Sequence, residues 1–210
     1  MPKFMMDAVM AGIWVRTDEG EDVAASIRHA VRTLQFVSDD PHSWKWIMLA
    51  LHSALQGACI CHLVTSASPF GAVTKRNAGE WLAYFEESRA NPTIKAPKTQ
   101  LMALPDLLKA VRKPRSAGDH SDGSDVAISS SDLVWLRRFH DEIRNQFVHF
   151  EPKGWAIELS GMPQLAALVA RIIDQIAEKG YAFRHMEANS LNAMRANLLA
   201  MGQHMEAALR

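Results

Sequence analysis

The chain has 210 residues, of which 48% are hydrophobic and 22% charged, and its formal net charge at pH 7 is zero. These proportions are typical of a soluble globular protein and exclude a globally disordered chain. The zero charge argues against nucleic-acid binding through bulk electrostatics, which needs an excess of Lys and Arg, although a local basic site is still allowed.

The first half of the sequence predicts mainly helices. An acidic stretch over 18–22 begins a helix that ends near Ser38, and an apolar helix follows from about His42 to Thr65. The turn between them is short, so we expect the two helices to be antiparallel neighbours. A shorter amphipathic helix is predicted over 79–89, then a loop over 91–97. Residues 101–111 predict another helix, which Pro105 must kink or restart.

The second half begins with a segment over 113–130 that is rich in Ser, Gly and Asp, and we expect it to form an exposed loop. A helix is predicted from Ser131 until Pro152 forbids its continuation. Its apolar residues recur at intervals of three and four, which predicts one buried face. The members of that face are Leu133, Leu136, His140, Ile143 and Phe147.

The C-terminal part predicts two further helices after a short alternating stretch, residues 155–159, which is typical of a strand. One helix runs from about Pro163 to Gly180 and the other from about Arg184 to the end. The last helix carries a heptad-like seam suited to core or dimer packing, formed by Leu191, Met194, Leu198, Met201 and Met205. We therefore predict a single all-α domain over 1–210, an antiparallel up-down helical bundle with extra helices and two peripheral loops.

Cysteine usage and hydropathy indicate the compartment. Cys59 and Cys61 lie two residues apart in a predicted helix, which is a poor spacing for a disulfide and suggests a reducing environment. The uncharged run 46–64 is long enough to cross a bilayer, but it holds four polar residues that lipid could not satisfy. We interpret it as a buried core helix, and we predict a cytoplasmic protein without a membrane segment.

The densest group of reactive side chains is RNQFVH, residues 144–149, at the end of the predicted core helix. An Arg followed by four residues and a His is weak evidence alone, since Arg115 and His120 repeat the spacing inside the polar loop. The helical context and the Asn that follows Arg144 distinguish the first pair.

This motif, with the run RNQFVHFEPKGWAIEL and the stretch LHSALQGACIC, resembles the HEPN domain, a nucleotide-binding family marked by Arg, a polar residue, three more residues and His. The similarity is to bacterial members without an assigned role rather than to the well-studied toxins. It implies a helical bundle that forms a homodimer in which two motifs face each other. Many members are metal-independent endoribonucleases, some in toxin and defence systems with an antitoxin partner. Others are inactive or serve as partner domains.

The chemistry of RNA cleavage assigns a role to each motif residue. Histidine side chains titrate near neutral pH, so His149 is the candidate base for a ribose 2′-hydroxyl. The Arg144 guanidinium can meet the charge that builds on the phosphate, and the product would be a 2′,3′-cyclic phosphate. Asn145 can donate to the phosphate or hold His149 in one tautomer, and the sequence leaves both roles open. No metal or other cofactor is needed.

Helix geometry restricts how these residues cooperate. Five residues along an α-helix turn through about 140° beyond one revolution, so Arg144 and His149 lie on different flanks of a straight helix. Either the helix frays before His149, or Arg and His from two chains meet across a two-fold axis. A structural alternative is that Arg144 pairs with Asp141 or Glu142 on its own helix.

Further candidates for substrate binding are His52, Gln56 and Lys153. His52 and Gln56 are one turn apart, so they could line the same cleft as Arg144 or bond to each other and to backbone. We expect no metal at Cys59, Cys61 and His62, because residues two apart on a helix point to nearly opposite sides. A basic cluster could guide RNA or be an ordinary solvated face, and its members are Lys109, Arg112, Lys113 and Arg115. The alternative function is a non-catalytic HEPN-like module that binds a nucleotide or a protein. The possible partners are a second copy of the chain, RNA or a nucleotide, and an antitoxin protein.

Overall fold

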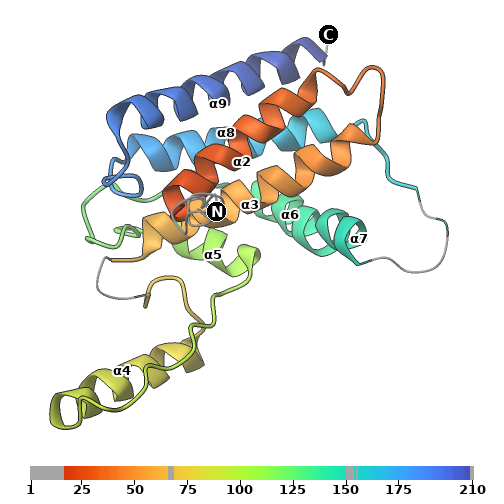
Figure 1. The fold of residues 1–210 in the computed structure, drawn as a ribbon. Coiled ribbons are helices and arrows are strands. Elements are labelled where there is room, and N and C mark those ends of the chain that lie inside the picture. The colour runs from red at the N-terminus through yellow and green to blue at the C-terminus, as the bar shows by residue number, and fades with distance from the viewer. Residues whose placement is uncertain (1–16, 66–68, 150–153, 155, 209–210) are drawn as a thin grey trace, which may run out of the picture.

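The structure is a computed structural model that describes residues 17–65, 69–149, 154 and 156–208. The described chain is helical, which confirms the all-α class and the bundle character. Its described residues form no strand, only isolated bridges such as that between Val73 and Leu101. Pro152, Lys153 and Trp155 lie outside the described residues. The elements, shown in Figure 1, are α2 (Glu19–Leu34), α3 (Ser43–Leu63), α4 (Lys75–Ala90), α5 (Leu104–Val111), α6 (Ser130–Arg138), the π-helix η1 (Phe139–Arg144), α7 (Asn145–Val148), α8 (Met162–Glu178) and α9 (Ala188–Ala208).

Helices α2 and α3 form the antiparallel pair that the short turn predicts (Figure 1). The Asp18 side chain caps α2 by accepting a hydrogen bond of 2.9 Å from the Glu21 backbone N–H. The two helices approach closely at Gly57, where an added Cβ would lie 2.7 Å from Val23 Cγ2. A larger residue at this position would therefore force Val23 or the two helices to move apart.

Helix α3 is the centre of the bundle, in contact with α2, α5, α8 and η1. Its buried residues lie on one broad side of the helix, whereas Leu49, Ser53 and Ile60 on the other side are partly buried or exposed. It is long and apolar enough to cross a bilayer, but 61% of its most apolar window is buried within the fold, so its length is weak evidence for a membrane segment.

Helices α8 and α9 complete the bundle (Figure 1). Pro163 lies in the first turn of α8, where its missing N–H costs nothing, and Leu165, Ile172 and Ile176 are buried. The methionine-rich seam of α9 is also buried, and α9 contacts α8 and α2 of its own chain. The seam is thus core packing in this chain.

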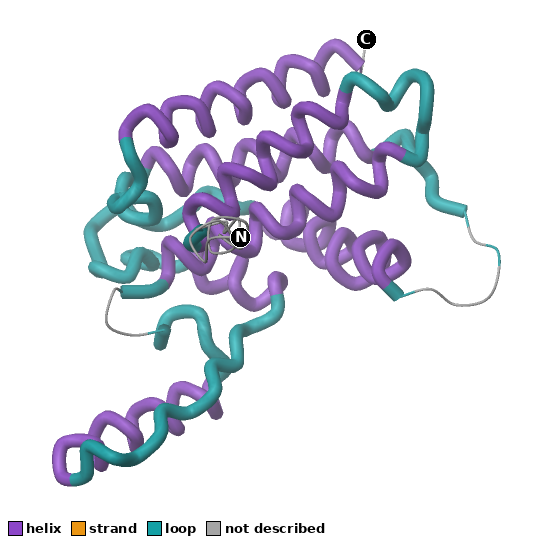
Figure 2. Tube along the Cα trace, viewed as in Figure 1, coloured by secondary structure: helices purple, strands orange, loops and turns teal. Residues whose placement is uncertain are grey.

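Helix α4 and residues 91–103 form an arm that projects from the bundle (Figure 2). The helix is longer than the predicted 79–89, because Thr74 caps it by accepting a hydrogen bond from the Asn77 N–H. Buried Asn77 joins the two halves of the arm: its Nδ2 donates to Lys98 O at 3.0 Å, and its Oδ1 accepts from the Gln100 N–H at 2.8 Å. The arm also has a small aromatic cluster, formed by Trp81, Tyr84 and Phe85, which Phe70 extends by an edge contact with Phe85.

Two peripheral segments differ from expectation. Residues 113–129 are irregular, as predicted, but they are not exposed throughout, because Ala117, Ser124, Val126 and Ile128 are buried. Backbone groups form hydrogen bonds where these residues pack, for example the Val126 N–H, which donates to Val111 O at 3.1 Å. Residues 156–159, expected in a strand, have no regular structure.

The predicted helix from Ser131 is continuous through α6, η1 and α7, but its middle turn is π-helical. Ser129 and Asp132 form a reciprocal capping box at its start. The wider π turn shifts the buried face, so that Phe139 is fully buried together with Leu136, whereas His140 is only partly buried. The predicted face was therefore wrong in placing His140 rather than Phe139 in the core.

The Phe139→Ala substitution should lower the free energy of unfolding by about 3–5 kcal/mol, because it empties a fully buried aromatic site. Phe36→Ala is the matched control, since Phe36 is 53% exposed and its truncation should cost less than about 1 kcal/mol. Urea unfolding followed by circular dichroism measures both. Equal losses would contradict the position of Phe139 in the π turn.

Candidate functional site

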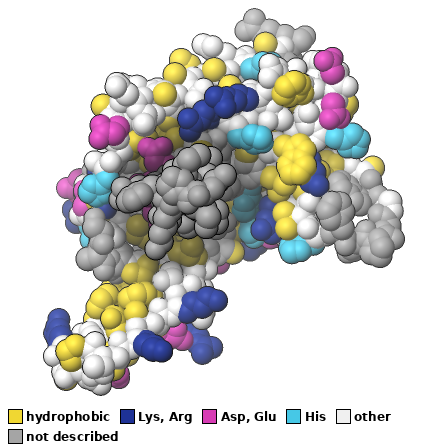
Figure 3. Space-filling view, in the orientation of Figure 1, with side chains coloured by type: hydrophobic (Ala, Val, Ile, Leu, Met, Phe, Trp, Pro, Cys, Tyr) yellow, Lys and Arg dark blue, Asp and Glu magenta, His cyan; other side chains and the backbone are white. Residues whose placement is uncertain are grey.

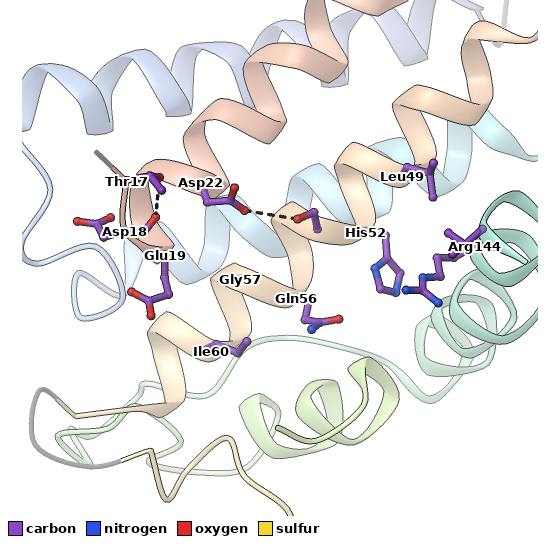
Figure 4. A pocket seen from close by; sticks show the side chains of 12 residues that line it. Thr17, Asp18, Glu19, Asp22, Leu49, His52, Gln56, Gly57, Ile60 and Arg144 are labelled. Carbon is purple, nitrogen blue, oxygen red and sulfur yellow. Dashed lines mark hydrogen bonds between the residues drawn. The ribbon is translucent and has the colours of Figure 1, made fainter. Parts of the chain in front are cut away.

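A cavity of about 720 Å³ lies between the start of α2, the outer side of α3 and the end of η1 (Figure 4). Three residues predicted for the site from the sequence line it together, namely His52, Gln56 and Arg144. The other lining residues are Thr17, Asp18, Glu19, Asp22, Leu49, Ser53, Gly57, Ile60 and Val148.

His52 lies at the inner wall of this cavity and is held by two residues of the π turn. Its Nε2 is 2.8 Å from His140 Nδ1, and its ring meets the edge of Phe139 at a centroid distance of 5.5 Å. Burial lowers the pKa of His52 to about 4, with smaller contributions from His140 and Arg144. Burial also lowers the pKa of His140. Both imidazoles are therefore neutral at physiological pH, and one donates the hydrogen bond that the other accepts.

Arg144 contributes the one positive charge among the described residues that line the cavity. Its Nη1 donates to Asn145 Oδ1 at 2.9 Å, so the adjacent amide positions the guanidinium. The carboxylates proposed as its structural partners bind other residues: Asp141 pairs with Arg137 at 3.8 Å and Glu142 with Arg138 at 2.8 Å. The ion-pair alternative for Arg144 is thus wrong, and Asn145 has a positioning role that the sequence did not indicate.

His149 does not line the cavity that Arg144 lines. It is the exposed residue at which α7 ends, with extended backbone angles, and its N–H donates to Asn145 O at 2.8 Å. It is not among the residues that line the cavity of Arg144. Within one chain the structure therefore brings Arg144 together with His52 and His140, and leaves His149 outside. Lys153, the remaining predicted contact, lies outside the described residues.

The opposite wall of the cavity is acidic, with Asp18, Glu19 and Asp22 all supplied by the start of α2. Asp22 Oδ2 accepts a hydrogen bond of 3.4 Å from Ser53 Oγ on α3. From the sequence, these acidic residues are predicted only to begin a helix. Periodicity gives no signal that they would face a cavity, because that depends on how α2 crosses α3.

The other candidate motifs form no comparable site. Arg115 of the second Arg-His pair binds Asp122 at 2.6 Å on the surface. His62 is buried with its Nε2 2.9 Å from Ser116 Oγ. Cys59 and Cys61 are buried free thiols, and burial raises the pKa of both, that of Cys61 to about 12. Within the described ranges no three His, Cys, Asp or Glu side chains come together as a metal site.

Charge on the surface is mixed. Figure 3 shows basic and acidic side chains interspersed on one face, without a broad basic area on that face. Two members of the basic cluster are paired with acids, Lys109 with Asp106 at 2.8 Å and Arg115 with Asp122. Recognition of an anion would therefore depend on local contacts.

No protein-family model, curated protein or solved structure matches this chain. Function has to be argued from what the cavity can do chemically. A guanidinium held by a neighbouring amide can bind a phosphate through two parallel hydrogen bonds. Neutral imidazoles beside it can donate to the same anion or accept a proton.

Stability should depend on the burial of His52. Because its pKa is lowered from 6.5 to about 4, the unfolded chain binds more protons than the folded chain between these values. The free energy of unfolding should therefore fall as the pH falls through this window, by about 3 kcal/mol for one histidine at 1.36 kcal/mol per pH unit. Buried His62, with the same lowered pKa of about 4, adds a similar loss.

Urea unfolding of the His52→Gln variant at several pH values measures this contribution, and the loss of stability between pH 6.5 and 4 should be smaller than in the unmodified chain, with His62 and His140 still contributing. Leu49→Ala, in the same cavity, is the control, since it removes packing without a titrating group. An unchanged loss in the His52→Gln variant would show that this imidazole is not desolvated.

Proposed function

We propose that this chain is a HEPN-like, metal-independent endoribonuclease that acts in the cytoplasm as a homodimer. The observation that carries the proposal is the position of Arg144, which lines a cavity beside a neutral histidine pair and is held by Asn145. The same proposal includes a HEPN-like topology for the helical bundle. It also includes a role in a toxin or defence system with an antitoxin partner.

The position of His149 supports a composite site. His149 ends α7 and is not among the residues that line the cavity of its own Arg144, which favours a site in which a second copy supplies this side chain. The 2′-oxygen then attacks its adjacent phosphorus while His149 takes the hydroxyl proton. The bond from phosphorus to the 5′-oxygen breaks, and the imidazolium returns the proton to that oxygen. Arg144 stabilises the charge that builds on the phosphate oxygens.

Single-stranded RNA should be cleaved at neutral pH in excess EDTA, leaving 2′,3′-cyclic phosphate ends. Arg144→Met and His149→Ala should each lower the rate by about a hundredfold or more, because each removes a group that acts in the transition state. Arg137→Met, on the same helix but paired with Asp141 outside the cavity, should change it little. Gel electrophoresis measures the cleavage rate, and chemical analysis of the RNA ends detects the 2′,3′-cyclic phosphate.

Co-expression of the two inactive variants tests the composite site. If Arg and His come from different copies, half of the dimers are mixed and each mixed dimer has one intact site, which restores about a quarter of the activity. A site within one chain would give no restoration. Intact RNA with the unmodified protein would remove the enzyme proposal altogether.

The acidic wall of the cavity favours a second candidate, a non-catalytic module that binds a nucleotide or a protein. Asp18, Glu19 and Asp22 outnumber Arg144 among the lining residues, so a long polyanion would meet repulsion there, whereas a small ligand with one phosphate could avoid it.

This second function predicts that a nucleoside monophosphate raises the melting temperature by several degrees while RNA stays intact. The Arg144→Met substitution should remove the shift and Arg137→Met should keep it, as measured by differential scanning fluorimetry. RNA cleavage by the unmodified chain would reject this alternative.

A further inference from the structure

The charges that line the cavity are separated along its length. In Figure 4 the α2 carboxylates lie on one side, Arg144 lies on the other, and Gln56 and His52 lie between them. A phosphate fits beside Arg144 and is repelled by Asp22 and its neighbours. A ligand that fills the cavity must therefore present a different kind of group to the acidic side.

Gln56 is the polar group next to the phosphate position. It is one helical turn from His52, an axial rise of about 6 Å, and Figure 4 draws no hydrogen bond from its amide to the other cavity residues. A glutamine amide donates and accepts side by side, and this pattern matches N7 and the exocyclic N6 amino group of adenine. Asp22, beyond it, is a carboxylate that accepts hydrogen bonds from amino groups.

We propose that this cavity reads an adenine base next to the bound phosphate, with Gln56 as the residue that determines specificity. The phosphate lies at Arg144, the Gln56 amide pairs with N6 and N7 of the base, and the amino group faces Asp22. The cavity of about 720 Å³ has the size of a small-molecule site. The inference rests on the proposed function, since it takes the anion at Arg144 to be a nucleotide phosphate.

Adenosine and inosine 5′-monophosphate test the inference, because inosine carries a carbonyl oxygen where adenosine has the amino group. Isothermal titration calorimetry with the full chain at low salt should give about tenfold tighter binding of adenosine monophosphate. Gln56→Leu should abolish the preference and leave weak binding of both nucleotides. Arg144→Met should lose both.

Matched controls separate these effects from damage to the fold. Gln203→Leu, at an exposed position of α9, and Arg137→Met should keep the affinity and the preference, and circular dichroism should show that all variants are folded. Equal affinity for the two nucleotides, an unchanged preference in Gln56→Leu, or no binding of either nucleotide would each overturn the inference.

The two proposals fail in different ways. Selective binding of adenosine monophosphate without RNA cleavage would keep the adenine subsite and reject the ribonuclease. Cleavage that ignores the base, with the same products from adenine and uracil homopolymers and no preference for adenosine monophosphate, would keep the ribonuclease and reject the subsite.

Discussion

The burial of α3 is the constraint on which the remaining structure depends. Helix α3 is the most apolar element of the bundle, and α2, α5, α8 and η1 pack against it and cover its buried side. Each histidine that it takes into the interior must then find a polar partner there. His62 finds Ser116 and thereby fixes the irregular segment after α5, while His52 finds His140 and fixes η1. The strip of α3 that none of the described helices covers becomes the floor of the cavity, so the packing of the core also creates the candidate site.

The π turn explains how one helix serves both the core and the cavity. Phe139 and His140 are adjacent in sequence, and in a regular α-helix they would point in directions about 100° apart. Both reach the ring of His52, at centroid distances of 5.5 Å and 5.1 Å, so the aromatic contact and the hydrogen bond come from successive residues. Arg144 closes the same π-helical segment and lines the cavity. Single π turns within α-helices occur frequently at functional sites, and here the widened turn gathers the reactive groups.

The sequence predicted those parts of the site that follow from local patterns. The acidic start of α2, the long apolar α3 and the end of α7 ahead of Pro152 are all local signals. They left open whether His52 and Gln56 line the same cleft as Arg144, and in the structure all three line one cavity. The π turn could not be predicted, because a periodicity argument assumes regular helical spacing and thereby assigns His140 to the core. The burial of Val126 and Ile128 was missed for a related reason. Residues 113–130 are polar on average, which predicts an exposed loop. From Ser124 onward, however, every second side chain is buried, and an average over the segment does not show this.

Electrostatics limits the ligands that this fold can accept. A chain with zero net charge and one cation against three carboxylates in its cavity gains little from long-range attraction to RNA. Affinity must then come from short contacts at fixed positions, and the Arg144–Asn145 bond and the His52–His140 pair fix such positions before any ligand arrives. Preorganised contacts of this kind discriminate between small differences in a ligand, because a mismatched group leaves a buried polar partner unsatisfied. The same charge distribution that weakens general binding of polyanions therefore favours selection of one phosphate and one neighbouring group.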